Sequence, residues 1–490
     1  MADEKAKSKV QGKQDGEERS TDSFCRALFN GHLLEDRLIP YPKTDPSSWG
    51  DIVDAVVRFG AERVNPREID ENGKIPTEIL DEMKGLGLFG MIIPEEFGGI
   101  GLNATGYAKV MESVVPIDSS IAITLGAHQS IGLKGLLIFG TETQKKKYLP
   151  KLASGETIAA FALTEPTSGS DAQSIKTKAV LSADGKHYII NGSKLWITNG
   201  GMAEFFTVFA KVDVEQNGEK KEKVTAFIVE RGMGIKSLAE EHKLGIKGSS
   251  TVQLVLEDVK VPAENVLGEV GKGFKVAMAI LNSGRLGLAS GCVGASKFMM
   301  QESVKYAAER KQFDLHLVDF KMIKAYIAQM EVSTYVLESM VYLTTHWIDQ
   351  GVHDYSMESA ICKVFGSETC WDNVNRALQI AGGNGYMKDY PYERALRDSR
   401  INLIFEGTNE ILRLFIALTG LQAVATDLKE TQSSILSLFN EPAKGFGAFY
   451  GYATKRIRQN FSPEMAKKIH PALDRQVSNL GKSIASLSEA

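Results

Sequence analysis

The 490-residue chain has few of the residues that build metal centres or disulfide frameworks. Its four cysteines (Cys25, Cys292, Cys362 and Cys370) are scattered and form no Cys-x-x-Cys pair, and its eight histidines contain no His-Glu-x-x-His motif. We therefore predict no metal site, and we expect the cysteines to be reduced thiols of an intracellular protein, mostly in its core.

A strong excess of charge and a long apolar run are also missing. The formal net charge of -4 argues against a nucleic-acid-binding protein, which usually carries concentrated positive charge. No apolar run is long enough to suggest a membrane span. Residues 1–20 mix both charges with almost no apolar side chain, so we expect a disordered leader. Its acidic residues do not suit a mitochondrial presequence, and no presequence is visible.

The hydrophobic pattern divides the chain into a helical, a β and a second helical part, which predicts an α+β fold. A chain of this length needs more than one core. The predicted parts are a partly disordered leader (1–46), an N-terminal helical domain (47–159), a middle antiparallel β-barrel-like domain (160–272), a C-terminal four-helix bundle (273–420) and a tail (421–490).

The β domain is predicted from strand-like runs around tight-turn dipeptides. Asp184-Gly185, Asn191-Gly192 and Asn217-Gly218 each favour a hairpin because these residues tolerate positive φ. In the C-terminal part, one stripe keeps the 4,3,4,3,4 spacing of a long bundle helix: Ile323, Ile327, Met330, Thr334, Leu337 and Val341. A last helix is expected after Pro471.

One carboxylate stands out. Glu406 follows the apolar run 403–405 and precedes Gly407, so it is predicted to leave a buried segment at a turn, with Thr408 or Asn409 capping the next helix. Burial would raise its pKa toward that of a general base. The alternative is an ordinary glutamate at a helix start.

Three further segments have unusual composition. Residues 162–171 (ALTEPTSGSD) are rich in hydroxyls and small side chains, which allow close approach of a flat or phosphorylated ligand. Residues 196–200 (WITNG) place an aromatic and a hydroxyl on a strand. Residues 379–386 (QIAGGNGY) contain three glycines but lack the strand and helix of a dinucleotide-binding fingerprint. Polar turns and helix termination are the alternatives.

Taken together, these segments resemble the acyl-CoA dehydrogenase family. The resemblance covers about residues 87–420 in the family's order. The first family signature is similar to residues 162–174, and the second to residues 379–389 and 394–398, followed by the Glu406-Gly407-Thr408 ending.

The resemblance implies an FAD enzyme that introduces a trans α,β double bond into a fatty acyl-CoA thioester. Glu406 aligns with the catalytic base, and its backbone N–H is expected to bind the thioester oxygen, with Gly407 beside it at the substrate. Some relatives carry the base near Arg285 instead, but this chain has Gly284 at that position.

By the same resemblance, a set of residues is expected to contact FAD. Ser170 is expected at the pyrophosphate and at the substrate, and Thr198 at flavin N5. The set is Phe161, Leu163, Thr164, Ser170, Trp196, Thr198, Thr408 and Glu410.

A second set is expected to reach the FAD of a neighbouring subunit, which implies at least a homodimer. It contains Arg310, Gln312, Phe313, Gln379 and Gly383. Relatives usually have glycine after the phenylalanine, where this chain has Asp314, so the loop geometry there is open.

Asn282 and Arg285 align with contacts to coenzyme A. The segment 126–135 resembles the very-long-chain branch, in which glycines equivalent to Gly132 and Gly135 clear one helix face for a long acyl tail. Close helix packing is the alternative reason for these glycines.

The resemblance also implies partners and a location. We expect a long-chain acyl-CoA substrate, electron-transfer flavoprotein as electron acceptor, and a mitochondrial matrix or inner-membrane location. Basic residues of the tail are candidates for contact with the inner-membrane surface, with a solvated surface as the favoured alternative: Lys455, Arg456, Arg458, Lys467 and Lys468. One close relative of the branch serves as a respiratory complex I assembly factor, so such a role, with residual or secondary dehydrogenase activity, is the alternative function. An acyl-CoA oxidase is a third possibility.

Overall fold

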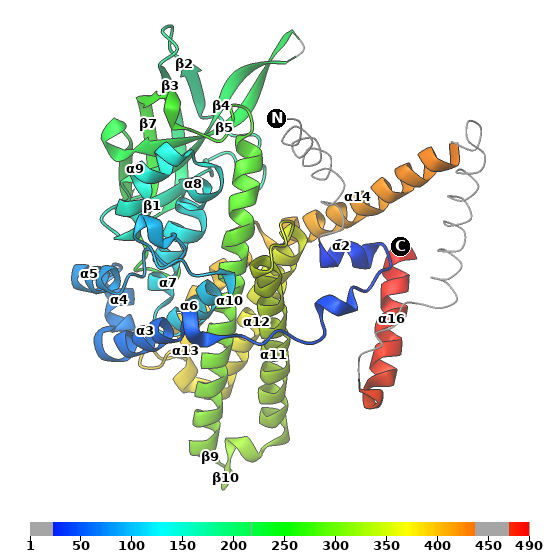
Figure 1. The fold of residues 1–490 in the computed structure, drawn as a ribbon. Coiled ribbons are helices and arrows are strands. Elements are labelled where there is room, and N and C mark those ends of the chain that lie inside the picture. The colour runs from blue at the N-terminus through cyan, green and yellow to red at the C-terminus, as the bar shows by residue number, and fades with distance from the viewer. Residues whose placement is uncertain (1–22, 217, 437–469, 490) are drawn as a thin grey trace. The chain divides into compact units, whose positions relative to one another are not determined.

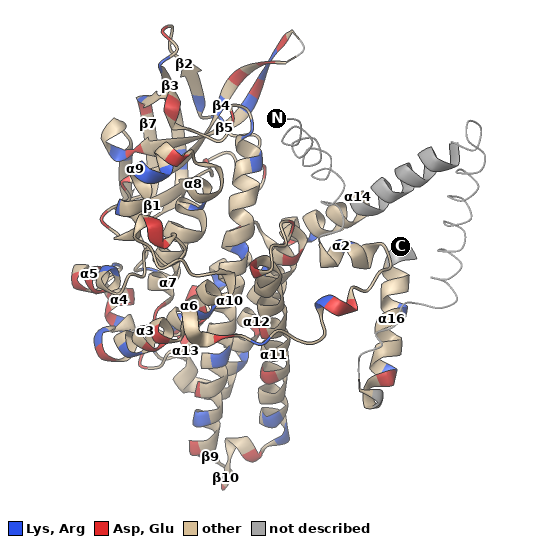
Figure 2. Cartoon of the chain, viewed as in Figure 1, with Lys and Arg blue, Asp and Glu red and all other residues tan. Residues whose placement is uncertain are grey.

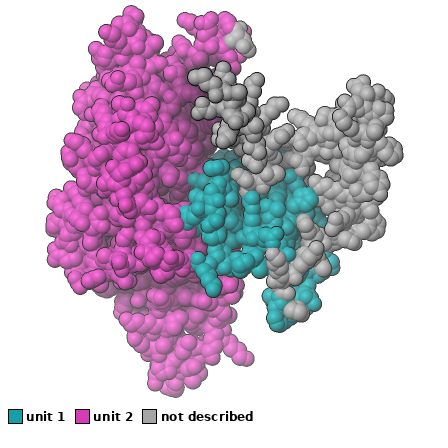
Figure 3. Space-filling view, viewed as in Figure 1, with its two compact units in different colours: residues 1–43, 343–361, 410–490 teal, residues 44–342, 362–409 magenta. Residues whose placement is uncertain are grey.

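The computed structural model describes residues 23–216, 218–436 and 470–489 (Figure 1). The chain forms two compact units (Figure 3). Unit 1 contains residues 1–43, 343–361 and 410–490, and unit 2 contains residues 44–342 and 362–409. The cavity and the base described below lie in unit 2, whereas Glu410, which is also expected at FAD, belongs to unit 1.

The first part of unit 2 is helical, as predicted. Its α-helices are α3 (Gly50–Arg63), α4 (Pro66–Asn72), α5 (Thr77–Gly85), α6 (Ala104–Val114), α7 (Ser119–Gly126), α8 (Lys134–Phe139) and α9 (Glu142–Ala153). A π-helical turn, η5 (Ala127–Gly132), joins α7 to α8. Local sequence sets several of the helix starts. Thr141, for example, caps α9 in a reciprocal capping box with Gln144.

The middle of unit 2 is a sheet with strand order β6-β7-β3-β2-β4-β5-β8, and β1 pairs with β4. The strands are β1 (Ala159–Ala162), β2 (Lys178–Leu181), β3 (His187–Thr198), β4 (Phe205–Gln216), β5 (Glu219–Glu230), β6 (Lys236–Glu240), β7 (Thr251–Pro262) and β8 (Val266–Leu267). The prediction of a purely antiparallel sheet is wrong in part, because β1 and β2 each run parallel to β4.

Two of the predicted hairpins are present: β2–β3 around Asp184-Gly185 and β4–β5 around residues 217–218, of which Asn217 lies outside the described residues. The third prediction is wrong. Asn191-Gly192 lies inside β3, where the pairing register shifts between Ile190 and Gly192 as at a β-bulge.

The sheet is covered on both faces along the first half of β4, which explains why five of its first six residues are apolar. Phe205 and Phe209 belong to one core, shared with helices α9 and α10 (Gly273–Glu309). Phe206, Val208 and Ala210 point to the opposite core, shared with β3 and β7. Strands buried on both faces lose the alternating pattern of a half-exposed sheet.

The second helical part follows the sheet. Its helices are α10, α11 (Lys321–Asp349), α12 (Ser356–Ala381), α13 (Tyr392–Ser399) and α14 (Asn409–Leu436), with a small hairpin of β9 (Lys311–Gln312) and β10 (Leu315–His316) after α10. Glycine permits the close approach of α10 to α6, since a Cβ at Gly294 would overlap the carbonyl of Glu112. On α11, Met330, Thr334, Leu337 and Val341 are buried, as the predicted stripe requires.

Unit 1 contains α2 (Phe24–Phe29) and α16 (Asp474–Glu489), which confirms the helix expected after Pro471. Residues 1–20, for which disorder was predicted, lie outside the described residues. Later in the predicted leader, α2 is held by side chains of the same unit. Ser23 donates to the Glu358 carboxylate at 2.6 Å, and Phe24 stacks on Trp347 at 5.0 Å between ring centroids. The five basic tail residues proposed for membrane contact lie outside the described residues.

Two stretches, Ser119–Phe139 and Gly273–Glu309, are long and apolar enough to span a membrane by length and composition alone. The expectation that no apolar run has this length is therefore wrong. In each, 67% of the apolar window is buried inside the protein, as in the core helix of a globular domain. Acidic and basic side chains are interspersed along the described elements (Figure 2), in keeping with the small net charge.

Candidate active site

A cavity in unit 2 collects residues that are far apart in the sequence. Its walls come from α6, α7, the π-helical turn, α10, α12, α13 and the segment that contains Glu406, and it encloses about 1150 Å³, part of which opens to solvent. Most of the wall is apolar. Such a cavity suits a long apolar ligand with one polar end at the few polar groups.

Glu406 is one of three carboxylates that line this cavity, together with Asp118 and Asp398. Its side chain is half-buried, and its Oε2 atom is buried without a hydrogen-bond partner in the part of the chain that the structure describes. Burial raises the pKa of Glu406 to about 7, and the charges of Arg285 and Lys363 oppose a larger rise. A carboxylate with these properties can take up a proton near neutral pH, which is what a general base requires.

Gly284 on α10 makes room for this carboxylate. A Cβ built at Gly284 would lie 2.8 Å from both Glu406 carboxylate oxygens and 2.8 Å from Cγ2 of Ile131. The position that carries the base in some relatives of the resembled family therefore faces the same point in space as Glu406. In this chain only one of the two positions can hold a carboxylate.

The backbone around Glu406 is unusual. Glu406 has φ 59° and Gly407 has φ 92°, so two successive residues adopt the left-handed region. Glutamate rarely adopts this conformation, which costs roughly 1–2 kcal/mol. Buried side chains hold both carbonyls: Arg285 Nε donates to Glu406 O at 3.1 Å, and Lys363 Nζ donates to Gly407 O at 2.7 Å. The predicted turn at Glu406 is thus confirmed, but the prediction of a buried segment before it is wrong, because Leu403 and Phe405 are only half-buried and Ile404 is exposed.

The π-helical turn supplies the wall opposite Gly284. It widens the chain between α7 and α8, and wide turns of this kind are frequent at functional sites. Buried His128 fixes it, because its Nδ1 accepts from Ala159 N at 2.9 Å and its Nε2 lies 3.1 Å from the carbonyls of Phe89 and Leu152. Burial lowers the pKa of His128 to about 4, so it stays neutral.

Four of the residues expected at FAD lie on two neighbouring segments: Leu163 and Thr164 follow β1, and Trp196 and Thr198 belong to the end of β3. Thr164 O accepts from Leu195 N at 2.9 Å, which places Leu163 and Thr164 beside the last residues of β3. Trp196 follows on β3 with φ 56° and 60% of its surface exposed, and Thr198 lines the Glu406 cavity.

These residues fit a flat cofactor. Trp196 is an aromatic side chain left uncovered next to Thr198, whose hydroxyl-bearing side chain reaches the cavity wall. The nearby turn exposes Thr167 and Ser170, which are suited to phosphate oxygens, and Phe161 lies half-buried on β1. Among the described residues there is no cluster of three or more His, Cys, Asp or Glu that could hold a metal ion.

The turn at residues 163–165 is held by a second buried lysine. Lys194 and Glu165 form an ion pair at 2.7 Å with side chains only 0% and 3% exposed, and Lys194 Nζ also donates to Leu163 O at 3.2 Å. Glu165 accepts in addition from the backbone N–H groups of Lys176 and Thr177. This pair is not predictable from the local sequence, because its two residues lie 29 positions apart.

A second group of expected FAD residues lies away from Glu406. Arg310 caps the C-terminal end of α10, 26 residues after Gly284, which corresponds to ~39 Å along a helix. Gln312 and Phe313 follow in the β9–β10 hairpin, where Phe313 is 88% exposed. Phe313 and Asp314 both have positive φ, which aspartate tolerates, so the turn forms without the glycine that relatives usually have.

The other expected cofactor residues differ in exposure. Gln379 and Gly383, at the end of α12, are exposed and do not line the cavity. Thr408 is half-buried directly after Gly407, and Glu410 is exposed in the first turn of α14.

Of the residues expected at coenzyme A, Arg285 is 5% exposed and Asn282 accepts from its Nη1 at 3.0 Å. Arg285 thus contacts the Glu406 backbone directly, a role that the sequence analysis did not foresee. Burial lowers the pKa of Arg285, and the Glu406 carboxylate opposes this.

Gly132 and Gly135 do not line the cavity at Glu406, and their expected role in an acyl tunnel stays a prediction. A Cβ at Gly132 would lie 2.7 Å from the Ala127 carbonyl and 2.8 Å from Ala159 Cβ, and one at Gly135 would lie 2.8 Å from Ile280. Close packing, the alternative, describes both positions. The glycines that do line the cavity are Gly126, Gly284, Gly287 and Gly291.

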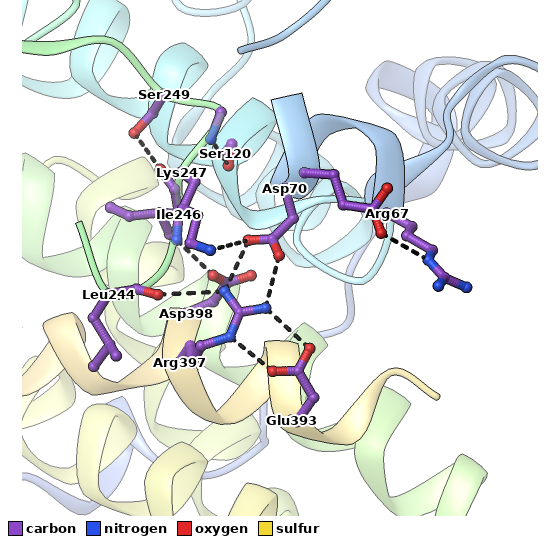
Figure 4. A network of polar contacts seen from close by, with 12 residues as sticks. Arg67, Asp70, Ser120, Leu244, Ile246, Lys247, Ser249, Glu393, Arg397 and Asp398 are labelled. Atoms are coloured by element: carbon purple, nitrogen blue, oxygen red, sulfur yellow. Dashed lines mark hydrogen bonds and ion pairs between the residues drawn. The ribbon is translucent and has the colours of Figure 1, made fainter. Parts of the chain in front are cut away.

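The second family signature has a structural role at α13. Arg397 forms a bidentate ion pair with Asp70 at 2.8 Å and a second pair with Glu393, and so ties α4 to α13 (Figure 4). Asp398 accepts from Ile246 N at 2.5 Å. Asp398 also lines the cavity, and burial raises its pKa to about 6.

Comparisons with known proteins agree with this site. The chain matches the models of the acyl-CoA dehydrogenase N-terminal domain at residues 50–156, the middle domain at 160–259 and the C-terminal domain at 271–421. It is 47% identical over 464 residues to the mitochondrial very long-chain specific acyl-CoA dehydrogenase of Macaca fascicularis, covering 92% of this chain and 70% of that protein.

Two solved structures have the same fold. An acyl-CoA dehydrogenase complexed with FAD from Bacillus anthracis is 37% identical with a TM-score of 0.76, covering 94% of this chain and 83% of that one. A chain from a study of the electron transferring flavoprotein of Acidaminococcus fermentans is 36% identical with a TM-score of 0.72, covering 77% and 98%. The chain therefore belongs to the acyl-CoA dehydrogenase family, whose members bind FAD.

Proposed function

We propose that the protein catalyses the FAD-dependent α,β-dehydrogenation of long-chain and very-long-chain acyl-CoA to trans-2-enoyl-CoA, the first step of fatty acid β-oxidation. The observation that carries the proposal is the Glu406 carboxylate, whose Oε2 is buried without a partner among the described residues at an apolar cavity. Glu406 takes the α-proton of the thioester, and the β-hydrogen leaves with its electron pair. FAD supplies the acceptor for that hydride.

Groups of the same turn would stabilise the negative charge that develops on the thioester oxygen. The backbone N–H of Glu406 makes no hydrogen bond within the described residues, so it is available as a donor. Gly407, at φ 92°, lets the chain turn without a side chain at this point. A fixed donor at the site of developing charge lowers the barrier by the oxyanion-hole effect.

The cavity supports a long acyl chain. Its wall includes Gly284, next to the base, and continues along α10 to Met299, a run of 15 residues or ~22 Å. Met111 and Val115 of α6 line the same cavity. The named relative acts on very long chains, and an apolar wall of this length is what such a substrate needs.

We further propose that FAD is held by Phe161, Leu163, Thr164, Ser170, Trp196 and Thr198, together with Thr408 and Glu410. Arg310, Gln312, Phe313, Gln379 and Gly383 would serve the FAD of a second copy in a homodimer. The ~39 Å of chain between Gly284 and Arg310 supports this division for Arg310, Gln312 and Phe313. Gln379 and Gly383 are exposed and do not line the Glu406 cavity.

Electron-transfer flavoprotein is the proposed acceptor of the electrons, and a mitochondrial location, in the matrix or at the inner membrane, follows the name of the matched relative. The comparisons give no support to the complex I assembly role.

Anaerobic mixing of the FAD-loaded protein with a series of acyl-CoA chain lengths tests the proposal. We expect the flavin absorbance to bleach most strongly with palmitoyl-CoA and longer chains. If the protein holds FAD but none of the acyl-CoA substrates bleaches the flavin, the dehydrogenase function is contradicted. If short-chain acyl-CoA bleaches it most strongly, the long-chain assignment is contradicted.

A further inference from the structure

Lys363 on α12 is a fully buried lysine that the sequence analysis did not single out. Its exposed fraction is 0%, and its Nζ donates to Gly407 O at 2.7 Å and to Asn409 Oδ1 at 2.8 Å. Burying an ammonium group is costly unless its hydrogen bonds are made. These two acceptors both belong to the turn that carries Glu406.

The same face of α12 holds the far side of the turn. Ser367, one helical turn after Lys363, exchanges hydrogen bonds with the Asn409 side chain, and Asn409 Nδ2 also donates to Glu368 at 3.1 Å. Asn409 is 1% exposed. The end of the turn is therefore fixed to α12 by side chains rather than by a backbone ladder.

The turn needs such fixing because its backbone is strained. Glu406 and Gly407 lie in the left-handed region, and strain of this kind persists only where the surroundings hold it. Arg285 holds the carbonyl of Glu406 from α10, while Lys363 holds the carbonyl of Gly407 from α12. Two buried cations thus donate hydrogen bonds to successive carbonyls directly beside the base.

The positive charge of Lys363 also acts on the carboxylate. It lowers the pKa of Glu406, as does Arg285, against the larger effect of burial. The other titratable groups that line the cavity with Glu406 are Tyr107 from α6, Cys292 from α10, Cys370 from α12, Asp118, and Arg394 and Asp398 from α13. Both cations that act on Glu406 also hold the backbone after its Cα: Arg285 binds the Glu406 carbonyl, and Lys363 binds the Gly407 carbonyl.

We propose that Lys363 is a positioning residue for the reaction: it fixes the Glu406 carboxylate by holding the Gly407 carbonyl and the Asn409 amide, and it provides positive charge that keeps Glu406 ionisable. This inference rests on the proposed dehydrogenase function. It predicts two separable effects, one on geometry and one on charge.

The test is Lys363→Met in the FAD-loaded enzyme, because methionine keeps the length of the side chain and removes the charge and both hydrogen bonds. We expect kcat to fall about tenfold to a hundredfold, as displacement of a reacting group does, with little change in KM. We expect the acidic limb of the kcat/KM profile to move up by about one pH unit, since the protonated form of Glu406 gains from loss of the nearby cation.

A measurement without turnover checks the same shift. Infrared difference spectra as a function of pH follow the carboxyl band of Glu406, which is assigned by its disappearance in Glu406→Gln. The band should titrate about one pH unit higher in Lys363→Met than in the unchanged enzyme. Lys297→Met is the matched control, because Lys297 pairs with Glu112 and Glu338 at 2.7 Å and 2.6 Å and does not line the cavity.

Asn409→Ala separates the two effects and serves if Lys363→Met does not fold. It removes one acceptor of Lys363 and leaves the charge, so kcat should fall while the pH profile stays in place. An unmoved acidic limb in folded Lys363→Met, or an Asn409→Ala enzyme with unchanged kcat, would overturn the proposal. If none of the acyl-CoA substrates bleaches the flavin of the unchanged enzyme, the proposed function itself fails. That outcome is distinguishable from a failure of the role proposed for Lys363.

Discussion

Two turns of this protein are each held by a fully buried lysine, and the two lysines have different partners. In the β domain, Lys194 forms an ion pair with Glu165 and holds the Leu163 carbonyl. In the helical part, Lys363 donates to the Gly407 carbonyl and the Asn409 amide oxygen. Both turns belong to the proposed active site, one on the cofactor side and one at the base.

The comparison shows that a buried lysine affects the pKa of a nearby carboxylate differently, depending on whether it forms a hydrogen bond to that carboxylate. Burial alone would raise the pKa of Glu165, but the charge of Lys194 and hydrogen bonds from Lys194, Thr177 and Lys176 lower it below its usual value. Glu165 is therefore fixed as a structural anion. Glu406 lies near Lys363 without a hydrogen bond to it, and its pKa stays raised to about 7. The first arrangement fixes shape, and the second leaves a carboxylate free to accept a proton.

The largest effect on stability is expected from breaking the ion pair of the β domain. Lys194→Met would leave the Glu165 charge buried without its cation, which typically costs about 3–5 kcal/mol in the free energy of unfolding. Denaturant unfolding measures this loss. Lys236→Met is the control, because the Lys236–Glu257 pair is two-thirds exposed and such pairs contribute only about 0–1 kcal/mol.

A loss of less than about 1 kcal/mol in Lys194→Met would contradict the view that this pair fixes the turn. The double variant Lys194→Met with Glu165→Gln should recover part of the stability, since it leaves no unpaired charge.

The next effect concerns the space that the base occupies. Gly284→Ala places a methyl group 2.8 Å from both Glu406 carboxylate oxygens, so the carboxylate must move. We expect turnover to fall about tenfold to a hundredfold, because misplacement of a reacting group by about 1 Å has effects of this size. Steady-state kinetics measures it, with Gly232→Ala as the control at a glycine that has open space. Full activity in Gly284→Ala would show that the base does not use this position.

The smallest effect is expected at Gly132. Because a Cβ there would meet the Ala127 carbonyl and Ala159, Gly132→Ala should lower the free energy of unfolding by about 1–3 kcal/mol through overpacking. The relative rates with octanoyl-CoA and palmitoyl-CoA should not change, since this residue does not line the cavity. A shift of the relative rates toward octanoyl-CoA without loss of stability would support the acyl-tunnel role expected from the sequence.

Much of this arrangement could be predicted from the sequence. The helical, β and helical order follows from hydrophobic periodicity, and the turn at Glu406 follows from an apolar run that ends in Glu-Gly. The parallel pairing of β1 and β2 with β4 could not be predicted, because short strands carry no local signal for their partners. The bulge at Gly192 was mistaken for a hairpin, since the same dipeptide suits both.

The supporting residues of the site were harder to find. A lysine within an apolar helix, such as Lys363 between Cys362 and Val364, is the one local signal of a buried cation, but its acceptors lie more than 40 residues away. The glycines of residues 126–135 look alike in sequence, and only the packing separates Gly126, which lines the cavity, from Gly132, which lies against β1. Such distinctions depend on contacts between distant segments.

The most direct test of the central claim is the rate of flavin reduction by palmitoyl-CoA in a single anaerobic turnover, measured across the pH range for the unchanged enzyme and for Glu406→Gln. Because Glu406 must be deprotonated to act, the rate in the unchanged enzyme should rise with pH through about 7. Glu406→Gln should retain FAD and bind the substrate, but above pH 7 it should reduce the flavin about a thousandfold more slowly, and its rate should not rise with pH through 7. A Glu406→Gln enzyme that reduces its flavin at the unchanged rate would contradict the assignment of Glu406 as the base.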